Sequence, residues 1–114
     1  MSFSEKLRKT HGEAMTLYKA IPETLQAYQG LMKAASKEGV LSGRVKELMA
    51  LSIAVRAQCE GCIVFHVNAA IKHGASREEV AETLSIAIEM GGGPATVYSG
   101  MALAVFDELK GSTA

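Results

Sequence analysis

The sequence has no excess of charge of either sign and no long apolar run, and each absence excludes a class of function. Its 114 residues include twelve Lys and Arg and twelve Asp and Glu, so the formal net charge is zero. This balance gives no indication of a nucleic-acid or anionic-membrane partner. No apolar stretch approaches the roughly 18 residues that span a bilayer. Residues 1–12 are charged and polar, unlike a signal peptide. We therefore expect a soluble cytoplasmic protein.

Signals for strands and for linkers are also missing. The chain has no hairpin turn, no alternating strand pattern and no low-complexity segment. Apolar residues instead recur at helical spacing, so the sequence predicts an all-α, single-domain helical bundle over residues 1–114. The expected helices cover residues 4–20, 22–37, 44–57, 59–73, 76–90 and 95–109.

Three residues predict where these helices begin and end. Ser42 is expected to cap the third helix, and Ser76 opens a capping-box sequence with Glu79. Gly74 is expected just after the end of the fourth helix, where glycine accepts the left-handed conformation.

The third and last helices are apolar on most of their circumference. A domain of this size cannot bury two such helices in one core, which predicts a homo-oligomer. Aliphatic neighbours also place four methionines in the core rather than around a cofactor: Met32, Met49, Met90 and Met101. Phe65 and Tyr98 are expected to be packed in the core, and the alternative is that they line a substrate pocket.

The chain has only two cysteines, and they lie in one stretch, Cys59-Glu60-Gly61-Cys62, followed by His66. At helical spacing these three side chains share a face. His66 leans toward Cys62, whereas Cys59 is two turns away, about 10 Å along the axis. A helix N-terminus and a nearby imidazole both favour a thiolate. The stretch therefore predicts redox or metal chemistry.

Glu47 is the acid that could act with this group. It lies twelve residues before Cys59 and heads an apolar stripe, so it needs a partner. Almost no loop joins its helix to the cysteine helix, so folding could bring it to His66, where it would orient the imidazole and relay protons. The alternative is an acid favoured by the dipole in a first helical turn, beside Arg44 and Lys46.

The spacing of Glu47 before Cys59-x-x-Cys62-x-x-x-His66 resembles the alkylhydroperoxidase D-like branch of the carboxymuconolactone decarboxylase family. The resemblance extends over residues 41–109 and includes the glycines before Pro94. It implies an all-helical fold assembled as a trimer or hexamer. It also implies thiol-dependent reduction of a small hydroperoxide, with re-reduction by a dithiol on a protein or a lipoyl-type group. Decarboxylation is not expected, because that branch lacks the cysteine pair.

The resemblance also implies a role for each residue of the group. By position, Cys62 matches the thiol that attacks the peroxide and Cys59 the thiol that resolves the product. Glu47 and His66 match the proton relay. No cofactor and no metal ion are expected.

Two other functions remain open for the same residues. Cys59, Cys62, His66 and Glu47 could ligate a metal, although three ligands from one helical stretch differ from the usual separated zinc pairs. A redox-sensing oligomer could instead use the disulfide to switch an interface, without turning over a substrate.

Overall fold

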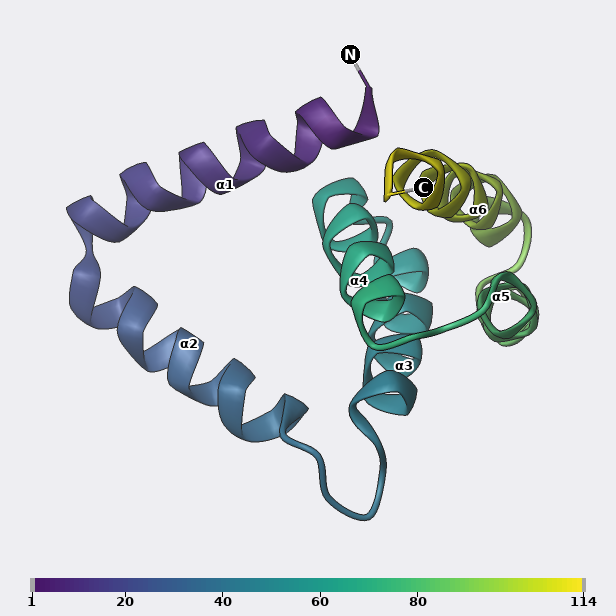
Figure 1. Ribbon diagram of the computed structural model, residues 1–114, viewed down its shortest axis with the longest axis horizontal. Coiled ribbons are helices and arrows are strands. Elements are labelled where there is room, and N and C mark those ends of the chain that lie inside the picture. Colours follow the sequence, from purple (N-terminus) through teal and green to yellow (C-terminus); the bar gives the residue numbers. More distant parts are fainter. Residues whose placement is uncertain (1, 114) are drawn as a thin grey trace.

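The computed structural model describes residues 2–113, and the side chains through residue 111. Within that range the chain forms helices and no strand, which confirms the predicted all-α class. None of these helices is long and apolar enough to cross a membrane. The helices are α1 (Phe3–Ala20), α2 (Pro22–Ser36), α3 (Gly43–Arg56), α4 (Glu60–Lys72), α5 (Arg77–Gly91) and α6 (Gly93–Thr113), as drawn in Figure 1.

The predicted helix ends are confirmed at three positions. Ser42 accepts a hydrogen bond from the N–H of Val45 at the start of α3. Ser76 and Glu79 form the complete capping box at the start of α5. Gly74 follows α4 with a φ of 83°, the left-handed conformation expected after a helix end.

The core lies entirely between the last four helices. Helix α3 packs against α4 and α5 and touches α6, while α4 and α5 each also pack against α6. Leu51 and Val55 of α3 and Ile63 and Val67 of α4 are completely buried in this core. Helix α3 is therefore central to the packing, as its composition predicts.

Helix α5 is also tied to α6 by an exposed ion pair. The Arg77 guanidinium donates two hydrogen bonds to the Asp107 carboxylate, at 2.8 and 3.1 Å. These bonds raise the pKa of Arg77 and lower the pKa of Asp107.

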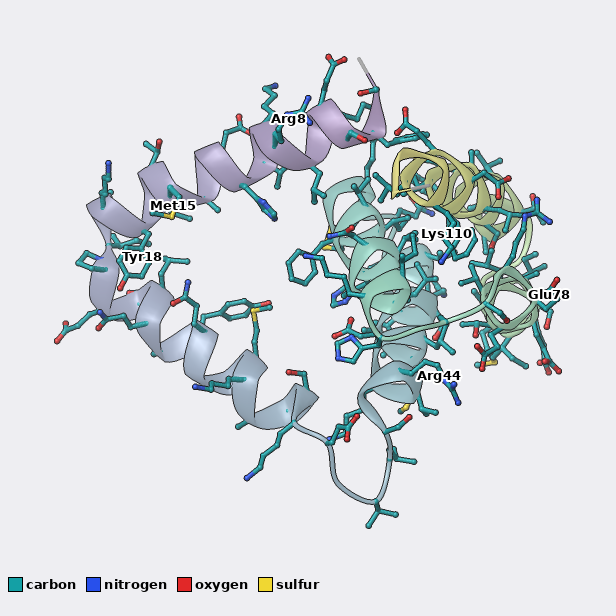
Figure 2. All side chains as sticks on the ribbon, viewed as in Figure 1. Arg8, Met15, Tyr18, Arg44, Glu78 and Lys110 are labelled. Atoms are coloured by element: carbon teal, nitrogen blue, oxygen red, sulfur yellow. A yellow bond between two sulfur atoms is a disulfide. The ribbon has the colours of Figure 1, made fainter. Side chains whose placement is uncertain are left out.

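Helices α1 and α2 form an arm that stands out from this core. Figure 1 shows them as a V whose open side faces α4. Neither helix has a buried residue. Phe3 and Leu7 pack against the edge of the core, and the N–H of Ser4 donates to Glu108 on α6. At the junction of the two arm helices, Tyr18 (Figure 2) accepts a hydrogen bond from Gln26.

Several apolar side chains predicted to be buried are exposed. Met49 and Ile53 lie on the side of α3 that faces away from the core and are 49% and 66% exposed. Met90 is 71% exposed at the end of α5. The core prediction is therefore wrong for these methionines, because the four-helix core covers only one side of α3 and α5.

Candidate active site

The two cysteines are joined by a disulfide at the start of α4, with their Cα atoms 5.2 Å apart. The sequence predicts Cys59 inside the helix. In the structure Cys59 is instead the N-cap residue of α4, in an extended conformation. Its sulfur accepts a hydrogen bond from the N–H of Cys62 at 3.2 Å. A sulfur therefore takes the place of the oxygen that usually caps a helix.

The two sulfur-bearing residues differ in their surroundings. Cys62 is exposed, whereas Cys59 is half-buried. As a residue, Cys62 is thus more open to solvent than Cys59, whose sulfur accepts the N–H of Cys62.

A tight turn places this disulfide next to the end of α3. In the sequence, Gln58 is only the polar residue that ends the apolar run before the cysteines. In the structure it adopts a left-handed φ of 57°. Its N–H donates to Val55, and the N–H of Cys59 donates to Ala54. These two bonds form a Schellman motif, in which glycine usually holds the left-handed position. The turn sends α4 back along α3.

This return brings Glu47 of α3 to His66 of α4. The Nδ1 atom of His66 lies 2.7 Å from the Oε2 atom of Glu47. The Glu47 side chain is 11% exposed and that of His66 24% exposed. When Nδ1 carries the proton and donates a hydrogen bond to the carboxylate, Nε2 is unprotonated and can accept a proton from another group. Glu47 lies beyond the first turn of α3 and pairs with His66, which favours the relay arrangement over the first-turn alternative.

His66 and Glu47 line an apolar cavity of about 500 Å³ between α2, α3 and α4. Met49 and Ile53 of α3 form part of its wall, which accounts for their exposure. The opposite wall comes from α2, through Tyr28 and Met32. The space is large enough for a small organic molecule.

A second cavity, of about 350 Å³, lies between α1 and α4. Its lining is more polar and includes Lys9 and His11 of α1, together with Glu60 and Gly61, the two residues between the cysteines. We call this space the α1–α4 cavity, and the first one the apolar cavity.

Phe65 separates the two cavities and lines both of them. Its ring makes an edge contact with the His66 ring, with the ring centres 5.1 Å apart, and a second one with His11 at 6.4 Å. Phe65 is 38% exposed, so its expected burial is wrong and the alternative, that it lines a pocket, agrees with the structure.

Comparison with known proteins identifies the family of the chain. The sequence profile of the carboxymuconolactone decarboxylase family matches residues 22–106. The chain belongs to this family. An uncharacterized protein of Cupriavidus necator is 45% identical over 105 residues, which cover 92% of this chain and 93% of the relative.

Solved structures of the family share the fold. A family member from Legionella pneumophila has a TM-score of 0.90 at 40% identity, covering 93% of this chain and 95% of its own. Another, from Thermotoga maritima, has a TM-score of 0.74 at 30% identity, covering 79% and 93%. A part in an antioxidative response has been suggested for the Thermotoga protein.

The structure brings the four predicted site residues into two adjoining pairs, the disulfide and the Glu47–His66 pair. Cys62 and His66 are four residues apart on α4, about 6 Å along the helix axis. Their catalytic roles, including direct proton transfer from Cys62 to His66, stay predictions. Sequence reasoning missed the contribution of α2, for which the only signal is that Tyr28 and Met32 are spaced one helical turn apart.

The metal site considered from the sequence is not assembled in this oxidised state. Both sulfurs are in the disulfide. Across residues 2–113, no group of three or more His, Cys, Asp and Glu side chains is placed to hold a metal ion.

Proposed function

We propose that this family member is a thiol-dependent hydroperoxide reductase that uses Cys59 and Cys62 as its redox pair. One observation carries the proposal. The His66 imidazole is held by Glu47 of α3, and His66 lies on α4, the helix that begins at the disulfide. A disulfide alone fits many functions. An oriented base beside it is the arrangement that activates a thiol nucleophile.

The reaction begins with the reduced pair. His66 accepts the proton of Cys62 at Nε2, and the Cys62 thiolate attacks the distal oxygen of the hydroperoxide. The O–O bond breaks, the alcohol leaves with the proton returned by His66, and Cys62 becomes a sulfenic acid. Glu47 stabilises the imidazolium that forms between these two proton transfers.

The second cysteine then closes the cycle. The Cys59 thiolate attacks the sulfur of the Cys62 sulfenic acid, the S–S bond forms, and the hydroxyl group leaves as water after gaining a proton. A dithiol reduces the disulfide through two thiol exchanges and is itself oxidised to a disulfide. The apolar cavity suits a hydroperoxide with a small organic group, because Met49 and Ile53 offer only apolar contacts.

We also propose that the protein works as a homo-oligomer, a trimer or a hexamer. The arm supports this proposal, since its two helices bury no residue although they carry large apolar side chains. Leu31 of α2, for example, is 64% exposed. A second copy of the chain would bury this surface.

Turnover with defined reagents tests the proposed reaction. Reduced protein is mixed with excess cumene hydroperoxide and dithiothreitol, and the alcohol formed per protomer is counted. We expect many alcohols per protomer, none above background for Cys62→Ser, and a dimedone-reactive sulfenic acid for Cys59→Ser. The opposite behaviour of the two variants would reverse their assigned roles.

A redox sensor is the alternative function. It would form the disulfide once with peroxide and would not turn over repeatedly when dithiothreitol is present. One alcohol per protomer, with a change in subunit number on oxidation, would favour the sensor.

A further inference from the structure

The apolar cavity is lined by an imidazole that has one nitrogen open to a ligand. Nδ1 of His66 is engaged by the Glu47 carboxylate, and both residues line the cavity. Nε2 has no hydrogen-bond partner among residues 2–111. Much of the remaining wall is apolar and includes Met32 of α2 and Ile53 of α3. A ligand in this cavity therefore meets a single open ring nitrogen in apolar surroundings.

The α2 wall of the cavity is held in place by a lysine of α3. The Lys46 ammonium donates a hydrogen bond to the carbonyl oxygen of Ala35 at 2.9 Å and another to that of Lys37. Both carbonyls lie at the C-terminal end of α2, where backbone oxygens lack partners within the helix and the dipole favours a cation. Because α2 contains no buried residue, these bonds fix its end to the core where packing does not.

One segment of α3 therefore positions both sides of the cavity. Lys46 and Glu47 are consecutive residues, and both line it. Glu47 orients the imidazole on one side, and Lys46 holds the helix that carries Tyr28 and Met32 on the other. The separation between the open nitrogen and the α2 wall is thus set through α3.

The charged groups at the cavity are already paired, which favours a neutral ligand. Glu47 is bonded to the imidazole, and the Lys46 ammonium is bonded to two carbonyl oxygens. An anionic ligand would bring its charge into apolar surroundings without an unpaired cation to receive it. A hydroxyl group on an apolar carbon skeleton needs only the open nitrogen and the apolar wall.

We propose that the apolar cavity binds a small neutral alcohol, and that Lys46 is a positioning residue that holds α2 against the organic group of this ligand. In the oxidised protein the hydroxyl donates a hydrogen bond to Nε2 of His66, and the organic group lies between α2 and α3. The inference rests on the proposed function and deepens it, because the alcohol released from the hydroperoxide is the compound that the reaction leaves beside Nε2. The substrates are then hydroperoxides that carry an apolar carbon group.

A binding experiment on the oxidised protein, with no peroxide present, tests the site. Cumyl alcohol, the product of cumene hydroperoxide reduction, is titrated while the imidazole nitrogen resonances of labelled protein are recorded. We expect a saturable shift at Nε2 of His66 and none at His11 or His73, which do not line the apolar cavity. No shift at His66, or equal shifts of all three histidines, would rule out this site.

Matched tryptophan variants test where the organic group lies. Ala50→Trp fills the cavity from α3, whereas Ala81→Trp makes the same change at an exposed position on α5 that does not line it. We expect Ala50→Trp to weaken cumyl alcohol binding at least roughly tenfold and Ala81→Trp to weaken it less than about twofold. Far-UV circular dichroism checks that both variants remain folded. Equal affinities for the two would refute the assignment of the cavity.

Matched lysine variants test the role of Lys46. Lys46→Met removes the bonds to the end of α2, whereas Lys33→Met makes the same change at an exposed position of α2 that does not line the cavity. We expect Lys46→Met to weaken cumyl alcohol binding roughly tenfold, because hydrogen bonds from a charged group are lost, and Lys33→Met to weaken it less than about twofold. Lys46→Arg keeps a donor and should recover most of the affinity. Equal affinities for the two methionine variants would show that Lys46 does not position the wall.

Peroxidase kinetics separate this inference from the proposed function. Lys46→Met should raise KM for cumene hydroperoxide roughly tenfold but change kcat/KM for hydrogen peroxide less than about twofold, since hydrogen peroxide has no organic group that contacts α2. Equal losses with the two peroxides would overturn the selectivity. Saturable alcohol binding at His66 in a protein without peroxide turnover would support the site while the proposed function failed.

Discussion

The four helices of the core and the two helices of the arm use amphipathic sequence in different ways. Helices α3 to α6 bury their apolar faces against one another, whereas α1 and α2 contain no fully buried residue and only Phe3 and Leu7 of α1 pack against the core. The core holds the disulfide and the Glu47–His66 pair in place. The arm supplies the outer walls of both cavities. Chemistry should therefore depend on the core, while access and assembly should depend on the arm.

The largest effect is expected from a change in the relay. Glu47→Gln keeps a hydrogen-bonding side chain beside His66 but removes the charge that stabilises the imidazolium. We expect the rate of peroxide reduction to fall by roughly 10²–10⁴, the usual contribution of general acid–base catalysis. Stopped-flow measurement at neutral pH checks this. Glu82→Gln, on the exposed surface of α5, is the control and should keep the wild-type rate.

The next effect concerns the stability of the core. Leu51 is completely buried, so Leu51→Ala should lower the free energy of unfolding by about 2–5 kcal/mol. Leu17→Ala, on the arm at 49% exposure, should change it by no more than about 0.5 kcal/mol in dissociated protomers. Urea unfolding at a protein concentration that gives protomers checks both. Similar losses for the two variants would contradict the division between core and arm.

A charge on the arm should affect assembly instead. Leu31→Glu places a carboxylate on the apolar surface that we propose a second copy covers. We expect the subunit dissociation constant to rise at least roughly tenfold, about 1.4 kcal/mol, with the helical content unchanged. Sedimentation velocity measures this change. An unaltered subunit number would show that α2 does not lie in the interface.

The smallest expected effect is on stability, and it comes from substitutions in the two turns that flank α4. Both are Schellman motifs, but Gln58 holds the left-handed position in one and Gly74 in the other. Gln58→Gly should stabilise the protein by about 1 kcal/mol, and Gly74→Ala should destabilise it by about the same amount. Thermal unfolding of the two variants checks this pair. Changes of the same sign would contradict the account of the turns.

Local sequence signals predicted the ends of the core helices well. Ser42, Gly74 and Ser76 each act within a few residues, so their roles follow from neighbouring backbone groups alone. The spacing of Cys59 from Cys62 fits a helical face and so predicts Cys59 inside the helix, whereas Cys59 is the N-cap residue and caps α4 with its sulfur. Cysteine is not among the residues preferred at N-caps, so the residue type does not predict that Cys59 caps a helix.

Long-range geometry was less accessible from the sequence. The spacing singles out Glu47 and His66, but it leaves open whether Glu47 pairs with His66 or is a first-turn acid beside Arg44 and Lys46. The packing of α3 against α4 decides between the two. For the same reason the sequence predicts burial for Met49 and leaves the choice between the core and a pocket wall undecided for Phe65. Both are apolar residues among apolar neighbours, and only the placement of the arm shows that they line cavities.

The most direct test of the whole account is the mass of the reduced protein after one equivalent of an organic hydroperoxide. The protein should lose two hydrogens within seconds as Cys59 and Cys62 form their disulfide. His66→Ala should slow this loss at least roughly a hundredfold, since the thiol then lacks its base. Equal rates for the two proteins, or no loss of mass in the wild type, would contradict the proposed mechanism.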